Sequence, residues 1–428
     1  MTSIIQTTHS FDPTDNWETK QQLTSNPEAS GTGNTTGNAT GHDADDDVPK
    51  LSFDDMGLPD SLLRGIYGIG FVDPSPVQQR AIQLAKSGRD IIIQAQSGTG
   101  KTATFSIATL AQLDPATRAV QAIVLSPTRE LATQSQGVLE SLGKHVPLHT
   151  HASVGGANPQ DDRRAMQSGN THVVCGTPGR VLDNLSKRLL RADAVRVLVL
   201  DEADVLLREG FVEQVREIIS LLPEAAQIMV VSATLPQEVH EMTSKFLRDP
   251  HRVLVKAEQL TLHGISQFYV DCVEAREKAS VLEDLYAMFS LQQTVIFCNT
   301  RRTVQELAGY LRSKDFPISE IHSEMTQTER FDIMRRFRLG ESRLLVATDI
   351  IARGIDVQQI SMVINYDLPF EREDYSHRIG RSARFGRKGV AINLVVDRDL
   401  DKIRTLESFY ASEIREMPDP SVIARLLQ

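Results

Sequence analysis

The sequence predicts an α/β protein with two parallel sheets, each covered by helices. Short apolar runs rich in Val and Ile alternate with longer stretches of helical periodicity, a pattern typical of parallel sheets. The runs fall into two series along the 428 residues, a length sufficient for about two to three domains. The first series comprises Ile91–Ile93, Ala122–Leu125, His172–Cys175, Val197–Leu200 and Ile228–Val231, and the second comprises Gln267–Val270, Thr294–Cys298, Leu344–Ala347, Met362–Asn365 and Ala391–Val395.

Helical stretches separate these runs in both series. They include Val138–Leu142, Val212–Leu222, Lys278–Phe289, Thr303–Arg312 and Gln327–Phe337. In the last stretch Ile333, Met334 and Phe337 recur at helical spacing. Neither series includes the polar stretch Lys256–Ser266. We therefore expect one domain at residues 51–256, a flexible linker at 257–266 and a second domain at 267–428.

Residues 1–50 are rich in Gly, Thr, Asn, Ser and Asp, which predicts a disordered acidic tail. The tail holds eight acids and two bases, so it accounts for −6 of the net charge of −10. The remaining residues are only weakly acidic. A local basic groove for nucleic acid is compatible with this balance, although total charge does not demonstrate one.

Composition also narrows the cellular setting. No apolar run approaches the ~18–20 residues that span a bilayer, and the N-terminus lacks the charged start and apolar core of a secretory signal. The three cysteines, Cys175, Cys272 and Cys298, are far apart and form no C-x-x-C pair. We expect buried free thiols in a reducing compartment, the cytoplasm or nucleus, and no membrane partner.

A phosphate-binding loop is the central motif. The sequence AQSGTGKT, at Ala95, Gln96, Ser97, Gly98, Thr99, Gly100, Lys101 and Thr102, lies between an apolar run and a helical stretch. Strand, small-residue loop and helix are the setting that such a loop requires, since glycines let backbone N–H groups surround an anion at a helix N-terminus. Lys101 is predicted to reach the β- and γ-phosphates and Thr102 to ligate Mg²⁺. An ordinary solvated turn is the alternative for the loop alone.

Acidic residues end another apolar run, Val197–Leu200. Ligands bind at the carboxyl ends of strands in open α/β sheets, so acids at this position suit a metal site. We predict that Asp201 holds Mg²⁺ through water and that Glu202 orients or deprotonates the attacking water. The alternative is that these acids merely cap the next helix.

Together the phosphate loop, the DEAD sequence at Asp201–Asp204 and the SAT sequence at Ser232–Thr234 resemble the DEAD-box RNA helicases. The resemblance covers roughly residues 51–428 and is nearest to the branch of translation initiation factor 4A and its exon-junction relative. It implies two tandem RecA-like domains, with ATP and Mg²⁺ at the site. The sequence departs from the family at Ala383 and Ser323, where glycine is usual.

The resemblance also assigns nucleotide contacts. Gln78 is expected to recognise adenine and Phe71 to pack on the base. Gly354 and Asp356 are expected at the ribose or the end of the nucleotide. Arg378 and Arg381 are expected to act as arginine fingers on the γ-phosphate from the second domain. Ser232 and Thr234 are expected to couple the nucleotide site to RNA.

RNA contacts are implied for further loops. They are Pro127, Thr128, Arg129, Gly155, Gly156, Thr177, Pro178, Gly179 and Arg180 in the first domain, and Gln327, Arg330 and Thr348 in the second. Hydroxyls, backbone N–H groups and arginines suit sugar–phosphate contacts, which carry no base information. Aromatic residues make up 5% of the chain, and no aromatic-rich strand resembles a base-stacking platform. RNA binding without sequence preference is therefore expected.

The resemblance implies a monomeric ATP-dependent RNA helicase that unwinds short duplexes or remodels RNA–protein complexes in translation initiation or mRNA processing. Expected partners are RNA and either a scaffold initiation factor or exon-junction proteins. The main alternative is an ATP-locked RNA clamp that serves as a scaffold and turns over slowly. A DNA-translocating ATPase is a weaker alternative, since the acid tetrad ends in Asp204 rather than His.

Overall fold

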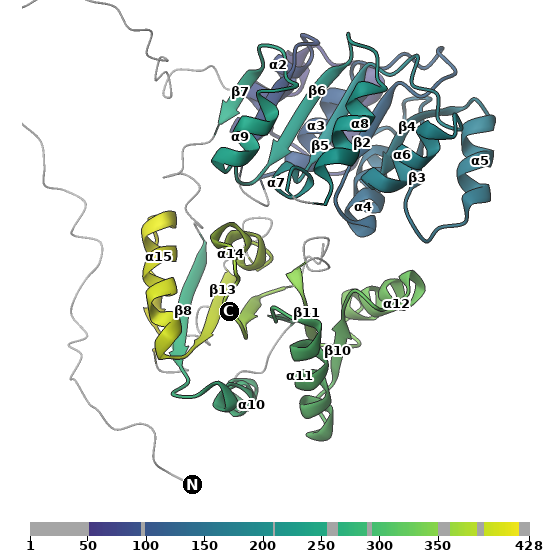
Figure 1. Ribbon diagram of the computed structural model, residues 1–428. Helices are drawn as coiled ribbons and strands as arrows, with labels where there is room; N and C mark the ends of the chain where they lie inside the picture. The colour runs from purple at the N-terminus through teal and green to yellow at the C-terminus, as the bar shows by residue number, and fades with distance from the viewer. Residues whose placement is uncertain are drawn as a thin grey trace, which may run out of the picture. The chain divides into compact units, whose positions relative to one another are not determined.

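The computed structural model describes residues 51–95, 99–208, 210–254, 264–288, 293–349, 360–382 and 389–418. The predicted acidic tail lies outside these residues, as does most of the predicted linker. Figure 1 shows the described elements in two groups, which we call the first half (residues 51–254) and the second half (residues 264–418).

The first half contains a mostly alternating series of helices and parallel strands around a seven-stranded sheet, in the order β3-β4-β2-β5-β6-β1-β7. Its strands are β1 (Ile91–Gln94), β2 (Ala122–Leu125), β3 (His149–Ser153), β4 (Thr171–Gly176), β5 (Val197–Asp201), β6 (Gln227–Ser232) and β7 (His251–Leu254). Its α-helices are α1 (Asp60–Gly68), α2 (Pro76–Ala85), α3 (Lys101–Leu110), α4 (Arg129–Leu142), α5 (Pro159–Gln167), α6 (Pro178–Ser186), α7 (Ala203–Leu206), α8 (Val212–Ser220) and α9 (Gln237–Thr243).

The second half is built in the same way, on a parallel sheet in the order β10-β11-β9-β12-β13-β8-β14. Its strands are β8 (Ile265–Asp271), β9 (Thr294–Phe297), β10 (Ile318–Ile321), β11 (Leu344–Ala347), β12 (Met362–Asn365), β13 (Gly389–Val395) and β14 (Arg415–Glu416). Its α-helices are α10 (Lys278–Met288), α11 (Arg301–Ser313), α12 (Gln327–Arg338), α14 (Arg372–Ile379) and α15 (Leu400–Tyr410).

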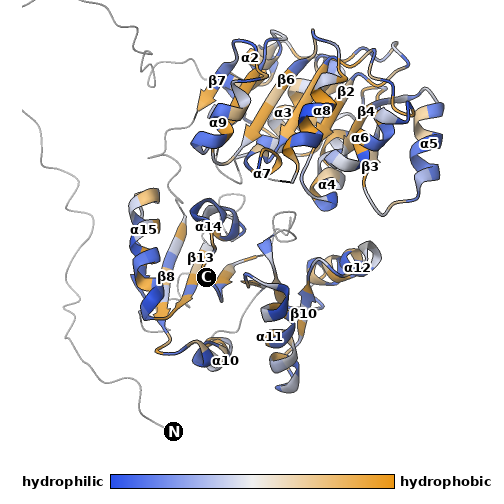
Figure 2. Cartoon of the chain, in the orientation of Figure 1, coloured by the Kyte–Doolittle hydropathy of each residue, from blue (hydrophilic) through white to orange (hydrophobic). Residues whose placement is uncertain are grey.

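Both faces of each sheet carry a hydrophobic core. Along β1, Ile91 and Ile93 belong to one core cluster and Ile92 to another, because successive side chains point to opposite faces of a sheet. In the second sheet, Val295 and Ile296 separate in the same way. Figure 2 shows the central strands of the first sheet in the colour of hydrophobic residues. Continuous apolar runs are what a strand covered on both faces requires, which explains why the sequence revealed them.

The prediction located the interior strands and missed the edges. All ten predicted runs overlap strands of the structure. The four strands that were not predicted, β3, β7, β10 and β14, are the two edges of each sheet in the described residues. Each is partly exposed and carries polar residues, so it lacks the continuous apolar signal. β8 also begins at Ile265, two residues before the predicted start of the second domain.

The prediction for the cysteines also has a counterpart in the structure. Cys175, Cys272 and Cys298 are buried free thiols, as expected, and burial raises the pKa of each. Among the described residues, no helix combines the length and apolar character needed to cross a bilayer.

Candidate active site and nucleic-acid interface

The phosphate loop joins the end of β1 to the start of α3. Its residues Gln96, Ser97 and Gly98 lie outside the described part of the chain. Gly100 has a φ of 87°, and a Cβ at this position would lie 2.7 Å from Nε2 of Gln78. The backbone conformation therefore favours glycine at this position.

Lys101 is the first residue of α3 and reaches back across the loop. Its Nζ donates a hydrogen bond to the carbonyl oxygen of Ala95 over 2.6 Å, and its side chain is buried. Burial lowers the pKa of Lys101, while the nearby carboxylates of Glu202 and Asp201 act in the opposite direction. The ammonium thus lies between the loop and the predicted catalytic acids. Thr102, the next residue of the helix, is partly buried.

The predicted metal-holding acids lie where β5 ends. Asp201 is the last residue of the strand, and its Oδ1 accepts a hydrogen bond from the backbone N–H of Glu202 over 3.1 Å. Burial and the charge of Glu202 raise the pKa of Asp201 against the opposing charge of Lys101. Glu202 is also buried, and its Oε2 lacks a hydrogen-bond partner in the described residues. Crowded, buried carboxylates fit a hard divalent cation such as Mg²⁺.

The predicted adenine contacts lie beside the phosphate loop. Gln78 and Ser75 form a capping box at the start of α2, in which Oε1 of Gln78 accepts from the backbone N–H of Ser75 over 2.8 Å. Phe71 is partly buried, and its ring centroid lies 6.4 Å from that of Phe53. One carbonyl lone pair of Gln78 is thus engaged within the protein. Its second lone pair and its amide N–H groups remain for recognition of a base.

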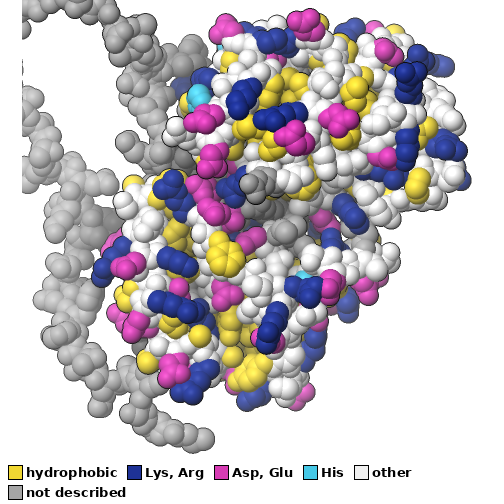
Figure 3. All heavy atoms as spheres, in the orientation of Figure 1, with side chains coloured by type: hydrophobic (Ala, Val, Ile, Leu, Met, Phe, Trp, Pro, Cys, Tyr) yellow, Lys and Arg dark blue, Asp and Glu magenta, His cyan; other side chains and the backbone are white. Residues whose placement is uncertain are grey.

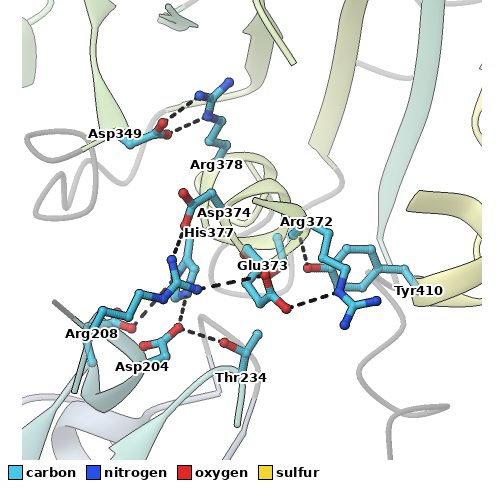
Figure 4. A network of polar contacts seen from close by, with 12 residues as sticks. Asp204, Arg208, Thr234, Asp349, Arg372, Glu373, Asp374, His377, Arg378 and Tyr410 are labelled. Atoms are coloured by element: carbon cyan, nitrogen blue, oxygen red, sulfur yellow. Dashed lines mark hydrogen bonds and ion pairs between the residues drawn. The ribbon is translucent and has the colours of Figure 1, made fainter. Parts of the chain in front are cut away.

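Residues of the second half meet the acids of the first half (Figure 4). Nε2 of His377 on α14 lies 2.9 Å from Oδ2 of Asp204, and its Nδ1 lies 3.7 Å from Oε2 of Glu202. The same Asp204 oxygen accepts from Oγ1 of Thr234 over 2.7 Å, and the Thr234 N–H donates to Oγ of Ser232 over 3.3 Å. The predicted coupling residues therefore form one buried network with the acids and with α14.

Asp204 and His377 were not predicted as site residues. Asp204 ends the DEAD sequence and His377 directly precedes the predicted Arg378, but neither was assigned a role in the site. Their separation of 173 residues along the chain hides the contact that makes them important.

Arg378 lies among partners that the sequence did not predict. Its guanidinium is buried and bonds to both carboxylate oxygens of Asp349, over 2.5 and 2.6 Å. It also donates to Oδ1 of Asn299 over 2.7 Å and to the carbonyl oxygen of Asp367 over 2.6 Å. These partners all belong to the second half. The Arg378 guanidinium is therefore engaged within its own half in this structure, and its assignment as an arginine finger stays a prediction.

Arg381 remains the better-placed finger. Its Nε donates to the carbonyl oxygen of His377 over 3.0 Å, and its charge contributes to the lowered pKa of Lys101. A positive group of the second half therefore lies close to the phosphate loop. Two further predicted nucleotide contacts, Gly354 and Asp356, lie outside the described residues.

Most predicted RNA contacts line one groove of about 660 Å³. The predicted residues among its lining are Pro127, Thr128, Arg129, Gly155, Thr177, Gly179, Arg180 and Arg330. Seven of them come from three separate segments of the first half, which are loops and the helix starts that follow them, and Arg330 comes from α12 of the second. The groove is therefore lined by segments that are far apart in the sequence.

Helix N-termini build much of this groove. Thr128 caps α4 by accepting from the backbone N–H of Leu131 over 3.2 Å, and Thr177 precedes α6. The Arg129 guanidinium lies against the Gly155-Gly156 turn, where a Cβ on Gly156 would come within 2.5 Å of Nη1. N-terminal backbone N–H groups and arginines are suited to bind phosphate.

The remaining predicted RNA contacts are not among the residues that line the groove. Gly156 and Pro178 adjoin lining residues, and Thr348 follows β11. Gln327 opens α12, but its side chain is outside the described set. Arg330 is held by the carbonyl oxygen of Ser323 over 2.6 Å, so the position that departs from the family contributes through its backbone. The lining also includes residues that were not predicted, namely Glu130, Asp183, Phe211 and Gln214.

Both halves of the chain match helicase families. Residues 75–242 match the family "DEAD/DEAH box helicase", and residues 277–386 match "Helicase conserved C-terminal domain". The ATP-dependent RNA helicase eIF4A of Chaetomium globosum is 53% identical over 86% of this chain and 92% of its own. Eukaryotic initiation factor 4A of Drosophila melanogaster is 53% identical over 86% of this chain and 91% of its own.

Solved structures of helicases are also similar to this chain. Dbp5 of S. cerevisiae bound to RNA and ADP BeF3 is similar with a TM-score of 0.83 and 34% identity, covering 88% of this chain and 100% of its own. A variant of Dbp5 bound to Nup159, Gle1, IP6 and ADP gives 0.61 at 32% identity, covering 87% and 100%. The expected pair of RecA-like domains is confirmed by these similarities. This chain therefore belongs to the DEAD-box family of ATP-dependent RNA helicases, which are ATP-hydrolysing enzymes.

Proposed function

We propose that this protein couples ATP hydrolysis to the unwinding of short RNA duplexes or the remodelling of RNA–protein complexes. The observation that carries the proposal is the groove that collects eight predicted RNA contacts. The TM-score of this chain is higher with Dbp5 bound to RNA and ADP BeF3 (0.83) than with the Dbp5 variant bound to Nup159, Gle1, IP6 and ADP (0.61), which supports the same proposal. In the proposed cycle, the arrangement of the two halves described here is the one that binds both ligands.

RNA is proposed to bind through its sugar–phosphate backbone. The groove offers hydroxyls, helix N-termini and the arginines Arg129, Arg180 and Arg330, and its described lining contains a single aromatic side chain, Phe211. Such a surface supports binding without sequence preference, because base identity is read from base edges. Contacts to the 2′-hydroxyl are the expected basis for preferring RNA over DNA.

For hydrolysis, Lys101 and the phosphate loop are proposed to hold the β- and γ-phosphates of ATP. Glu202 is proposed to orient or deprotonate the attacking water, and Arg381 to approach the γ-phosphate from the second half. Thr102, and Asp201 through water, would hold Mg²⁺, which would supply charge neutralisation. Gln78 and Phe71 are proposed to bind the adenine.

Coupling is proposed to run through the buried network around Asp204. Thr234 of the first half and His377 of the second bond to the same carboxylate oxygen. Ligands that bind across both halves favour the arrangement in which these bonds form. RNA bound through its backbone would then be bent, and hydrolysis would release it.

Translation initiation is the proposed setting, since relatives at 53% identity are named as initiation factor 4A. The proposed form is a cytoplasmic monomer that works with a scaffold initiation factor. The alternative is an RNA clamp. It would be identified by slow dissociation of RNA in the presence of a non-hydrolysable ATP analogue, if exon-junction proteins slowed that dissociation further. Equal stimulation of the ATPase by RNA and DNA would contradict the proposed substrate.

The proposed catalytic role of Glu202 is tested by Glu202→Gln. The amide keeps the shape but cannot accept a proton, so RNA-stimulated turnover is expected to fall by ~10²–10⁴ while ATP binding persists. Turnover is measured by phosphate release and binding by a fluorescent ATP analogue. Glu213→Gln, on the exposed face of α8, is the matched control. Wild-type turnover in the Glu202 variant would contradict the mechanism.

A further inference from the structure

One buried carboxylate beneath the RNA groove has no role in the proposed reaction. Asp162, on α5, is 1% exposed. Its Oδ1 lies 2.7 Å from Nε2 of His151. Its Oδ2 accepts from Nε of Arg180 and Nδ2 of Asn184, over 2.7 and 2.8 Å. Such a concentration of bonds to a single buried charge is expected to hold its neighbours in one geometry.

The partners of Asp162 come from two elements near the groove, β3 and α6. Oγ of Ser153, the last residue of β3, donates to Asp162 over 3.2 Å and accepts from Asn184 over 2.8 Å. Ser153 and Asp162 flank the Gly155-Gly156 turn, whereas Arg180 and Asn184 lie on α6. The carboxylate thus joins the two ends of one proposed RNA-binding loop to the helix that carries another.

Arg180 shows how this network reaches the ligand. Its Nε is bonded to Asp162, its side chain is 15% exposed, and it lines the groove. Its Nη2 is buried and has no hydrogen-bond partner in the described residues. One edge of the guanidinium is therefore fixed by the carboxylate, which leaves terminal N–H groups for an anion. Arginine commonly recognises phosphate with such a fork of donors.

The hydrogen bonds of the network keep the Asp162 side chain ionised. Burial alone would raise the pKa of Asp162, but hydrogen bonds from His151, Asn184 and Arg180 outweigh that effect and hold the pKa well below its usual value. The side chain is therefore a carboxylate at neutral pH. It is in the form that accepts from the arginine.

We propose that Asp162 is a positioning residue for RNA binding, which orients Arg180 toward an RNA phosphate and fixes the spacing of the two loops. The proposal rests on the proposed RNA-binding function of the groove. Asp162 does not touch RNA itself, so its effect passes through Arg180.

The test is a double-mutant cycle on the full chain. Affinity for a labelled single-stranded polyuridine is measured by fluorescence anisotropy with Mg²⁺ and a non-hydrolysable ATP analogue. Arg180→Ala and Asp162→Asn are each expected to weaken RNA binding about tenfold, because each change removes one charge-assisted hydrogen bond of the proposed contact. Combined, they are expected to weaken it less than about thirtyfold, rather than the hundredfold that independent sites would give.

Two further readouts separate positioning from general damage to the fold. Each variant is expected to lose about 0.7 from the slope of log affinity against log salt, the value for one phosphate contact on a single strand. For Asp162→Asn, the KM for ATP is expected to stay within about twofold of the wild type. The control Asp161→Asn, on the exposed face of the same helix, is expected to change none of these quantities.

The outcomes are distinct. An Asp162→Asn variant that binds RNA within about twofold of the wild type, or effects that multiply fully in the double variant, would overturn the positioning role. An Asp162→Asn variant whose KM for ATP rises in parallel would assign Asp162 to the fold alone. Failure of the wild type itself to bind polyuridine would overturn the proposed function, and this inference with it.

Discussion

Arg378 and Arg381 lie three residues apart at the end of α14 and meet different surroundings. Arg378 is closed in by Asp349, Asn299 and a backbone carbonyl of its own half. Arg381 contributes a positive charge beside Lys101 of the other half. Arg378 is therefore bonded within its own half in this structure, whereas Arg381 is proposed to serve the reaction.

Arg378→Ala is expected to destabilise the second half by about 3–5 kcal/mol, because it leaves a partly buried carboxylate and polar groups without their partner. Urea unfolding monitored by circular dichroism measures the loss. Arg381→Ala, the paired variant, is expected to keep its stability within about 1 kcal/mol and to lose ~10³-fold or more in RNA-stimulated turnover. The reverse pattern, stable but inactive Arg378→Ala, would identify Arg378 as the finger.

At the scale of elements, α14 is the helix that presents the second half to the first. Its start is anchored within its own half, where the Tyr410 hydroxyl on α15 donates to the carbonyl oxygen of Arg372 over 2.8 Å (Figure 4). Toward the first half, Glu373 and Asp374 each lie 3.9 Å from the guanidinium of Arg208. This arginine follows α7, the short helix that carries Asp204. Ion pairs therefore flank the His377 contact between these two helices.

Arg208→Glu is expected to lower RNA-stimulated turnover about fivefold, the equivalent of roughly 1 kcal/mol, since it places a third acid beside two others. Asp374→Arg is expected to have a similar effect, and the double variant Arg208→Glu with Asp374→Arg is expected to recover most of the loss. Steady-state ATPase assays at low salt provide the measurement.

Arg216→Glu is the control for this charge reversal. Arg216 lines the same surface depression as Arg208, but it pairs with Glu213 on its own helix. Its reversal is expected to leave turnover within about twofold of the wild type. No recovery in the double variant would show that these ion pairs do not act between the halves.

At the scale of the whole molecule, stability depends on buried charge as well as on the four hydrophobic cores. Figure 3 shows acidic and basic side chains interspersed over the face in view, an arrangement in which individual exposed pairs contribute little. Buried charges are different. The Asp162 carboxylate exchanges water for several direct hydrogen bonds, and its protonation state is linked to folding.

Acid is therefore expected to destabilise the first half partly through Asp162. Its pKa is depressed in the folded state, so its contribution is present above the ordinary pKa of an aspartate, ~3.9, and is lost as pH falls below that value. Asp162→Asn is expected to cost about 2–3 kcal/mol at pH 7 and progressively less below about pH 4. Urea unfolding at several pH values measures this difference. A difference that does not change with pH would contradict the linkage.

Much of the fold was predictable because interior strands must be apolar on both faces. Runs such as Ile91–Ile93 and Val197–Leu200 could be read directly, since each face of the sheet needs its own core. Edge strands such as β3 (His149–Ser153) have no such requirement. Hydrogen bonds to a neighbouring strand define them, and those bonds depend on residues distant in the sequence.

The candidate site also contains residues that the sequence predicted and contacts that only the structure revealed. The sequence by itself determined the phosphate loop and the acids at the end of β5, because their chemistry depends on local strand–loop–helix geometry. Only the tertiary structure decided which side chains meet across long separations. It bonded His377 to Asp204, enclosed Arg378 among partners of its own half, and set Asp162 beneath Arg180. Such contacts are selected by burial, where each charge needs a partner, and a local motif does not specify that partner.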